Sequence, residues 1–211
     1  MNPDSLIFDM DGTLWDAVDA YAQSWTEVFK AKGIPRVMKR EDLQKLMGQE
    51  VKDLLAAAIP EIPENEREYF YRDVLAQYDI EIPKPKNGVI IYPGVVEGLK
   101  ELSTKYKLFI LSNCDKGGIK LFLNYTGTEK YITDYFEHGE NYMPKYHNMK
   151  LLIEKHSLQY PMYVGDTDSD SKQSQMAGVP FIFVNYGFGA TQNYAAEFDD
   201  FSELCYYFMN I

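Results

Sequence analysis

The stretch LIFDMDGTLWD, residues 6–16, places three carboxylates directly behind a short apolar run. The apolar residues 6–8 predict a buried β-strand. A carboxylate in an apolar interior is costly unless a cation or hydrogen bonds compensate its charge. A buried strand that delivers Asp9 and Asp11 to one place therefore indicates a functional site.

Three later runs share the apolar character of residues 6–8. They are LFIL at 108–111, MYV at 162–164 and FIFV at 181–184, and helix-like stretches separate them. Strands that alternate with helices are typical of α/β proteins with a parallel sheet. The sequence therefore predicts a Rossmann-like parallel sheet flanked by helices.

The segment between the first two predicted strands has a different pattern. Apolar residues spaced by three and four predict helices over 17–32, 42–59 and 64–78. Asp16 is placed to cap the first helix and Gly33 to end it, whereas IPKPKNG at 82–88 has the composition of a linker. This segment therefore reads as helical throughout, with no strand signal.

A helical segment inserted between two strands of a sheet predicts a second domain. We expect a helical cap domain at 16–88 and an α/β core domain formed by 1–15 and 89–211. A chain of 211 residues with 45% hydrophobic residues has enough core material for both.

Composition restricts the partners and the location. Binding to nucleic acid or to an anionic membrane needs a basic face, and a net charge of −11 argues against both partners. The chain has two cysteines, no apolar run near the length of a membrane span and no basic segment followed by a long apolar one at its start. These features predict a cytoplasmic protein and leave its oligomeric state open.

Polar residues follow several of the predicted strands directly. Asp9 and Asp11 follow the first strand, Ser112 and Asn113 the second, and GDTDSD at 165–170 the third. The carboxyl ends of the strands in an open α/β sheet meet at one edge, where ligands bind. We therefore expect these side chains to share one site.

Three of these stretches and one lysine together resemble the motifs of the haloacid dehalogenase superfamily. They are FDMDGTLWD, LFILSN, Lys145 and VGDTDSD, which occur in the family's order and span the chain. Lys150 is a rival for the lysine motif, and Pro144 precedes Lys145 where the family usually has Lys-Pro, but the spacing to Asp166 favours Lys145. The helical insert and the stretches YPGV and VNYGFG resemble phosphoglycolate phosphatase-like members, which have a four-helix cap.

The resemblance implies a site for Mg²⁺. In the family pattern Asp9 and Asp166 supply carboxylate ligands, Asp11 a backbone carbonyl, and Asp170 supports the ion or its waters. A phosphate monoester would be repelled by this group of carboxylates unless a cation offset their charge. A hard divalent ion with oxygen ligands suits such a site.

The resemblance also implies the reaction. Asp9 is expected to attack phosphorus and form an aspartyl-phosphate, and Asp11 to act as general acid and then base. Lys145 would hold the nucleophile and the phosphate, while the Ser112 hydroxyl and the Asn113 backbone N–H would bind phosphoryl oxygens. The sequence therefore predicts a Mg²⁺-dependent phosphatase that acts on a small phosphorylated metabolite.

Two alternatives remain open at this stage. A phosphomutase resembling β-phosphoglucomutase would use the same aspartates, although residues 45–55 do not clearly match the cap loop of such mutases. A non-catalytic module that binds a phosphorylated ligand is the other, although such a module would not need Asp11. Asp168 and Trp15 are expected to have structural roles, at a helix N-terminus and in packing respectively.

Overall fold

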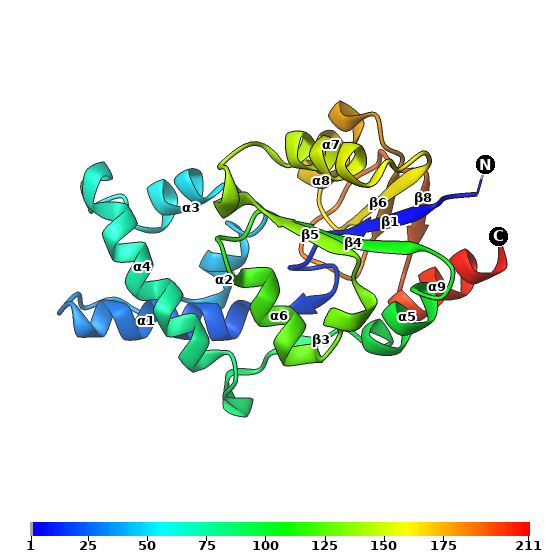
Figure 1. The fold of residues 1–211 in the computed structure, drawn as a ribbon. Helices are drawn as coiled ribbons and strands as arrows, with labels where there is room; N and C mark the ends of the chain where they lie inside the picture. Colours follow the sequence, from blue (N-terminus) through cyan, green and yellow to red (C-terminus); the bar gives the residue numbers. More distant parts are fainter. Residues whose placement is uncertain (1) are drawn as a thin grey trace. The chain divides into compact units, whose positions relative to one another are not determined.

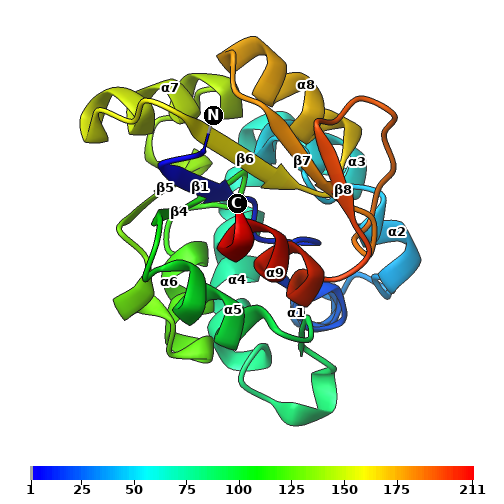
Figure 2. The ribbon, with the colours of Figure 1, turned by 90° about the vertical axis from the view of Figure 1, so that its right-hand side faces the viewer.

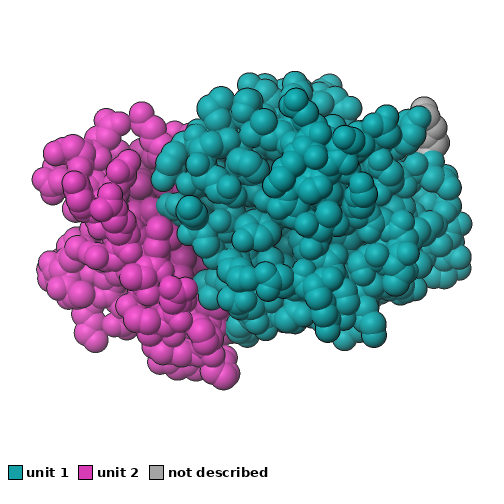
Figure 3. Space-filling model, in the orientation of Figure 1, with its two compact units in different colours: residues 1–15, 91–211 teal, residues 16–90 magenta. Residues whose placement is uncertain are grey.

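The computed structural model describes residues 2–211, which form two compact units. One unit contains residues 2–15 and 91–211, and the other contains residues 16–90 (Figure 3). Two short strands, β2 (Trp15–Asp16) and β3 (Ile90–Ile91), pair with each other where the chain passes between the units.

The first unit is built on a sheet of six parallel strands in the order β5-β4-β1-β6-β7-β8. The strands are β1 (Ser5–Phe8), β4 (Lys107–Ser112), β5 (Asp134–Glu137), β6 (Pro161–Gly165), β7 (Phe181–Val184) and β8 (Ala196–Phe198). The predicted α/β class and all four predicted strands are therefore confirmed.

Helices cover both faces of this sheet (Figures 1 and 2). One face carries α7 (Lys145–His156) and α8 (Asp168–Ala177). The other carries α5 (Val95–Leu102), α6 (Gly118–Thr126) and α9 (Phe201–Asn210). The remaining turns of helix in this unit are the 3₁₀ segments η2 (Glu129–Tyr131) and η3 (His138–Glu140).

The central strand β1 is buried on both faces. Ile7 belongs to a cluster with Phe109 and with Met149 of α7, whereas Phe8 faces the other way and lies 5.8 Å from Phe201 of α9, measured between ring centroids. Burial on both faces explains why the strand reads as a continuous apolar run rather than an alternating one.

The sequence analysis did not predict the two edge strands, β5 and β8. Their sequences are DYFE and AEF, and each is short and partly exposed. An edge strand in contact with water keeps charged residues, so it lacks the apolar run that identified the inner strands.

The second unit consists of helices, as predicted. They are α1 (Val18–Ala31), α2 (Arg40–Gln44), α3 (Val51–Ala58), α4 (Glu64–Glu81) and the 3₁₀ segment η1 (Pro85–Asn87). An aromatic cluster joins α1 to α4, in which Trp25, Phe29 and Phe70 are buried with ring centroids 5.5–6.0 Å apart.

The single helix predicted over 42–59 is in fact two helices, α2 and α3. Gly48 lies between them with a φ of 76°, a left-handed conformation that interrupts a helix and that glycine adopts at little cost. The apolar spacing of three and four continues across this break, so it did not reveal the interruption.

Asp16, which was predicted to cap α1, lies one residue before the N-cap, Ala17, and its carboxylate contacts both α1 and α2. Its Oδ1 accepts a hydrogen bond from the Val18 N–H at 3.0 Å, and its carboxylate pairs with the guanidinium of Arg40 in α2.

Among residues 2–211, no helix combines the length and the apolar character needed to cross a bilayer.

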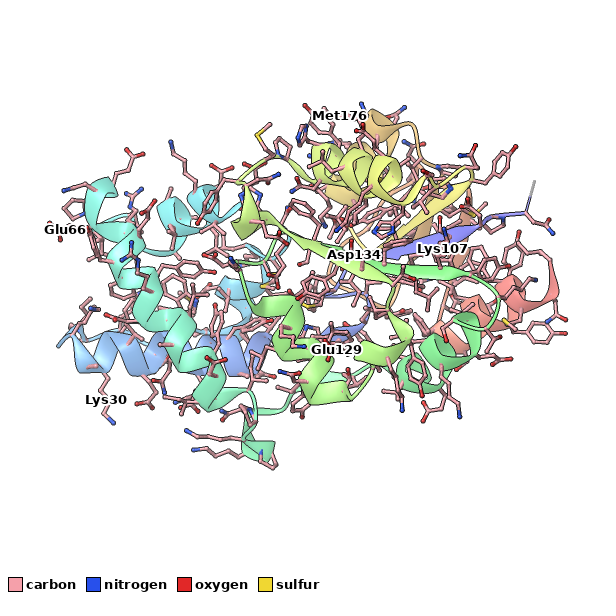
Figure 4. All side chains as sticks on the ribbon, viewed as in Figure 1. Lys30, Glu66, Lys107, Glu129, Asp134 and Met176 are labelled. Carbon is pink, nitrogen blue, oxygen red and sulfur yellow. The ribbon has the colours of Figure 1, made fainter. Side chains whose placement is uncertain are left out.

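Asp134, labelled in Figure 4, joins the edge strand β5 to the last turn of α7. Its Oδ2 lies 2.7 Å from the Lys155 ammonium and 2.7 Å from Nε2 of His156. Burial alone would raise the pKa of Asp134, but these two contacts outweigh it and hold the pKa below its ordinary value of 3.8.

We expect Asp134→Asn to lower the free energy of unfolding by about 0.5–1 kcal/mol at pH 7, because the carboxylate is only partly buried. A carboxyl whose pKa is lower in the folded state stabilises the fold above its unfolded pKa and loses that effect as the pH falls through the folded pKa. Urea denaturation of wild type and variant should therefore give a smaller difference at about pH 3 than at about pH 5. A difference that does not shrink between these two pH values would contradict this assignment.

Candidate active site

The site lies at the carboxyl ends of the three central strands. Asp9 follows β1, Ser112 ends β4, and Asp166 follows β6. The chain adds β4 and β5 on one side of β1 and then returns to add β6 on the other side. Such a reversal of strand order opens a ligand-binding crevice at the carboxyl edge of the sheet.

The turn after β1 winds around one carbonyl group. The Met10 oxygen accepts hydrogen bonds from the N–H groups of Thr13, Leu14 and Trp15, at 3.3, 2.8 and 3.3 Å. Gly12 in this turn has a φ of 89°, and a Cβ atom there would lie 2.3 Å from Oδ2 of Asp166. The turn therefore needs glycine, both for its backbone conformation and for the close approach of Asp166.

Lys145 brings the first and last aspartates of the motifs together. It opens α7 directly after Pro144, and its ammonium lies 3.0 Å from Oδ1 of Asp9 and 2.7 Å from Oδ1 of Asp170. All three side chains are buried, each with no more than about 5% of its surface exposed. Although Pro144 precedes Lys145 instead of following it, the lysine still reaches the acidic cluster formed by Asp9, Asp166 and Asp170.

Asp170 accepts four hydrogen bonds. Its Oδ1 receives the Lys145 ammonium and the Tyr163 hydroxyl, at 2.7 and 3.1 Å. Its Oδ2 receives the N–H and the hydroxyl of Thr167, at 3.1 and 2.6 Å. Four donors match the number of lone-pair positions on a carboxylate, so Asp170 is saturated by protein groups.

Asp166 is held by two segments far apart in sequence. Its Oδ1 accepts the Thr13 hydroxyl at 3.2 Å, and its Oδ2 accepts the Phe188 N–H at 2.7 Å. The loop that carries Phe188 also contacts the turn after β1, since the Tyr186 hydroxyl donates to the Thr13 carbonyl at 2.9 Å. This loop therefore positions Asp166 and the turn after β1 together.

The pKa values of the cluster follow from burial and charge. Burial raises the pKa of Asp9 to about 7, although the Lys145 ammonium acts in the opposite direction. Burial and the charges of Asp170 and Asp9 raise the pKa of Asp166 well above its ordinary range. For Asp170 burial acts upward too, but the charge and hydrogen bonds of Lys145, with those of Thr167 and Tyr163, hold its pKa below the ordinary value.

The donor set fits a divalent cation. One oxygen from each of Asp9, Asp166 and Asp170 lies within 4.8 Å of the others, and all three residues are buried. When these carboxylates and Lys145 are all ionised, three negative charges and one positive charge leave a net charge of −2. A hard ion such as Mg²⁺ binds oxygen ligands of this kind and would balance that charge. Because Asp170 is already saturated, Asp9 and Asp166 have more capacity to bind an ion directly.

The other predicted site residues lie on the same unit with local contacts. Oδ1 of Asp11 accepts the indole N–H of Trp15 at 2.9 Å, and the buried Ser112 hydroxyl accepts the Cys114 N–H at 3.2 Å. Asn113 follows Ser112 directly at the end of β4. The structure therefore places Asp11, Ser112 and Asn113 at the carboxyl edge of the sheet, while Lys145 forms ion pairs with Asp9 and Asp170.

Sequence reasoning did not identify the role of Thr167 or the hydrogen bond between Trp15 and Asp11. Thr167 and Asp170 form a reciprocal capping box at the start of α8, and the Thr-x-x-Asp spacing in GDTDSD could have predicted it. Trp15 is fully buried and packs edge-on against Phe122 as expected, but its bond to Asp11 has no signal in the sequence. Asp168 lies in the first turn of α8, as predicted, and pairs with Lys172.

Comparisons with known proteins agree with this geometry. The family model described as haloacid dehalogenase-like hydrolase matches residues 6–184. A phosphoglycolate phosphatase of Rhodobacter capsulatus is 26% identical over 95% of this chain and 94% of its own length. Another from Agrobacterium fabrum is 28% identical over 86% of this chain and 80% of its own.

Solved structures share the fold over nearly the whole chain. The crystal structure of a predicted phosphoglycolate phosphatase from Haemophilus somnus aligns with a TM-score of 0.83 and 21% identity, covering 98% of both chains. A haloacid dehalogenase-like family hydrolase from Streptococcus pneumoniae aligns with a TM-score of 0.81 and 18% identity, also covering 98% of both chains.

The α/β fold with its acidic cluster defines a class of hydrolases that bind ligands at the carboxyl edge of the sheet. This chain belongs to the haloacid dehalogenase-like hydrolase family, because the family model matches most of its length. The family predicted from the four motifs is confirmed.

We expect Gly12→Ala to destabilise the protein, because the added methyl group would meet the Asp166 carboxylate and the residue would keep a positive φ. The strain should lower the free energy of unfolding by about 2–3 kcal/mol, or Tm by about 4–12 °C. Gly178→Ala is the matched control, since Gly178 has a φ of 78° but nothing within 4 Å of the added atom. Equal Tm losses in the two variants would show that Asp166 does not constrain Gly12.

Proposed function

We propose that this protein is a Mg²⁺-dependent phosphatase that hydrolyses a small phosphate monoester through an aspartyl-phosphate on Asp9. The observation that carries the proposal is the buried ion-paired group in which Lys145 contacts both Asp9 and Asp170, with Asp166 alongside. Buried carboxylates of this number are costly to a protein that gains only stability from them. They are useful to an enzyme that binds a cation and a phosphate.

Asp9 is the proposed nucleophile. Its oxygen attacks phosphorus, the bond from phosphorus to the ester oxygen breaks, and water later hydrolyses the aspartyl-phosphate to release inorganic phosphate. Lys145 keeps the attacking carboxylate in place and offsets its charge as the dianionic phosphate approaches. Burial of Asp9 removes the competing hydration shell of its carboxylate.

Asp11 is the proposed general acid and base. It would protonate the leaving alkoxide and later accept a proton from the attacking water. The Trp15 indole N–H donates to Oδ1 of Asp11 at 2.9 Å, which restrains the orientation of the carboxyl group. Ser112 and the Asn113 N–H are proposed to bind the phosphoryl oxygens, on which negative charge increases in the transition state.

Asp9 and Asp166 are proposed to hold Mg²⁺ with the backbone carbonyl of Asp11, and Asp170 to support the site. When bound, the ion would supply positive charge that lets a phosphate enter an acidic site. The charge balance of the cluster supports this assignment, since the protein residues alone leave a net charge of −2 when ionised.

The helical unit is proposed to serve as a cap that selects the substrate, with residues 16–88 as its predicted extent. The curated relatives are named phosphoglycolate phosphatases, so phosphoglycolate is the first metabolite to test. A panel of phosphorylated metabolites ranked by kcat/KM in the presence of Mg²⁺ would identify the preferred ester.

Asp9→Asn tests the mechanism, because an amide cannot act as the nucleophile. We expect kcat for p-nitrophenyl phosphate with Mg²⁺ to fall by at least about a thousandfold, as is usual when a covalent nucleophile is removed. Fluoroberyllate, a mimic of the phosphoryl group on aspartate, should bind the wild type and not the variant. Asp168→Asn is the control, since Asp168 is exposed and lies in the acidic stretch 165–170 beside Asp166 and Asp170. Full activity of Asp9→Asn would rule out the covalent mechanism.

Metal binding can be measured without turnover. At about 100 times its Kd, Mg²⁺ should stabilise the wild type by about 2.7 kcal/mol, which raises Tm by about 5–10 °C. Asp166→Asn should lose this rise because a carboxylate ligand is gone, and Asp168→Asn should keep it. A Tm of the wild type that is the same in Mg²⁺ and in chelator would contradict the proposed metal site.

A further inference from the structure

Tyr163 is a buried tyrosine whose hydroxyl points into the acidic cluster. It lies on β6, has no exposed surface, and belongs to the apolar cluster that contains Ile7, Phe109 and Met149. Phenylalanine would fill the same space without bringing a polar group into an apolar core. The hydroxyl therefore needs an explanation beyond packing.

That hydroxyl donates to Oδ1 of Asp170 at 3.1 Å. The same oxygen accepts the Lys145 ammonium at 2.7 Å, so the tyrosine and the lysine share one acceptor atom. The Lys145 nitrogen also lies 5.6 Å from the centroid of the Tyr163 ring, within the range of a cation–π contact. Tyr163 therefore restricts both the carboxylate that holds Lys145 and the space around the ammonium.

The opposite oxygen of Asp170 is restrained by Thr167, which donates through its N–H and its hydroxyl. With Tyr163 on Oδ1, donors other than Lys145 hold both oxygens of the Asp170 carboxylate, and this restricts where Oδ1 meets the ammonium.

We propose that Tyr163 is a positioning residue that holds the Lys145 ammonium beside Asp9 by anchoring Oδ1 of Asp170. This inference rests on the proposed function, in which the ammonium must align the attacking carboxylate. Tyr163 lies on a core strand and outside the four motifs, and the proposal gives it a part in the reaction.

Tyr163→Phe removes only the hydroxyl and keeps the ring. We expect kcat for p-nitrophenyl phosphate with Mg²⁺ to fall by about ten- to a hundredfold, because misplaced charge at the nucleophile affects the transition state most. KM should change less than about threefold, since the ground state is bound mainly by other groups. A purely structural role would instead lower Tm and leave kcat of the folded enzyme unchanged.

Tyr106→Phe is the matched control. Tyr106 is also buried in the same unit and donates its hydroxyl to the Phe208 carbonyl, away from the acidic cluster. Its variant should keep kcat at the wild-type level even if its Tm falls. Equal kcat losses in the two variants would overturn the proposal, because they would reflect a general effect of losing a buried hydroxyl.

A crystal structure of Tyr163→Phe gives a readout that does not depend on turnover. We expect the Lys145 nitrogen to leave its position beside Oδ1 of Asp9, or to occupy two positions, when compared with a wild-type crystal structure. An unmoved Lys145 would overturn the proposal whatever the kinetics show. A wild type that turns over no phosphate ester with Mg²⁺ would instead refute the proposed function, and the position of Lys145 would still decide the role of Tyr163.

Discussion

The arrangement of the site depends on one buried ammonium shared by two carboxylates. Lys145 lies within 3.0 Å of oxygens of both Asp9 and Asp170, and the carboxylates are brought from opposite ends of the core sequence. Removing one partner from a buried ion pair of this kind typically costs about 3–5 kcal/mol, because the remaining charge is left uncompensated. Burial lowers and the two carboxylates raise the pKa of Lys145, and the carboxylates prevail, so it stays charged.

Asp166, the third carboxylate of the acidic cluster, is held by hydrogen bonds rather than by an ion pair. Asp166 receives one bond from the turn after β1 and one from the loop after β7, so its position depends on two segments besides its own. Its pKa is raised well above the ordinary range by burial and by neighbouring carboxylates. A carboxylate held in this way favours the binding of a cation, because the cation relieves the repulsion that the fold has left in place.

The sheet explains why these groups meet. Parallel strands end at one edge, and the strand order reverses at β1, so the residues after β1 and β6 lie side by side at that edge. Glycine at position 12 then lets Asp166 approach the turn after β1 more closely than any side chain would allow. Apolar packing around Ile7, Phe109 and Met149 holds the strands whose ends carry the site.

The α/β class, the inner strands, the helical insert and the family could be predicted from the sequence, because apolar runs and the four motifs are local in the chain. The sequence could not reveal the edge strands, whose charged residues resemble loops, or the break at Gly48, across which the apolar spacing continues. Which donors meet each carboxylate depends on how the strands, helices and loops pack, and it could not be predicted from the sequence. The bonds from Tyr163 to Asp170 and from Phe188 to Asp166 join residues on different elements, and no periodicity in the sequence encodes a contact that forms only when those elements pack.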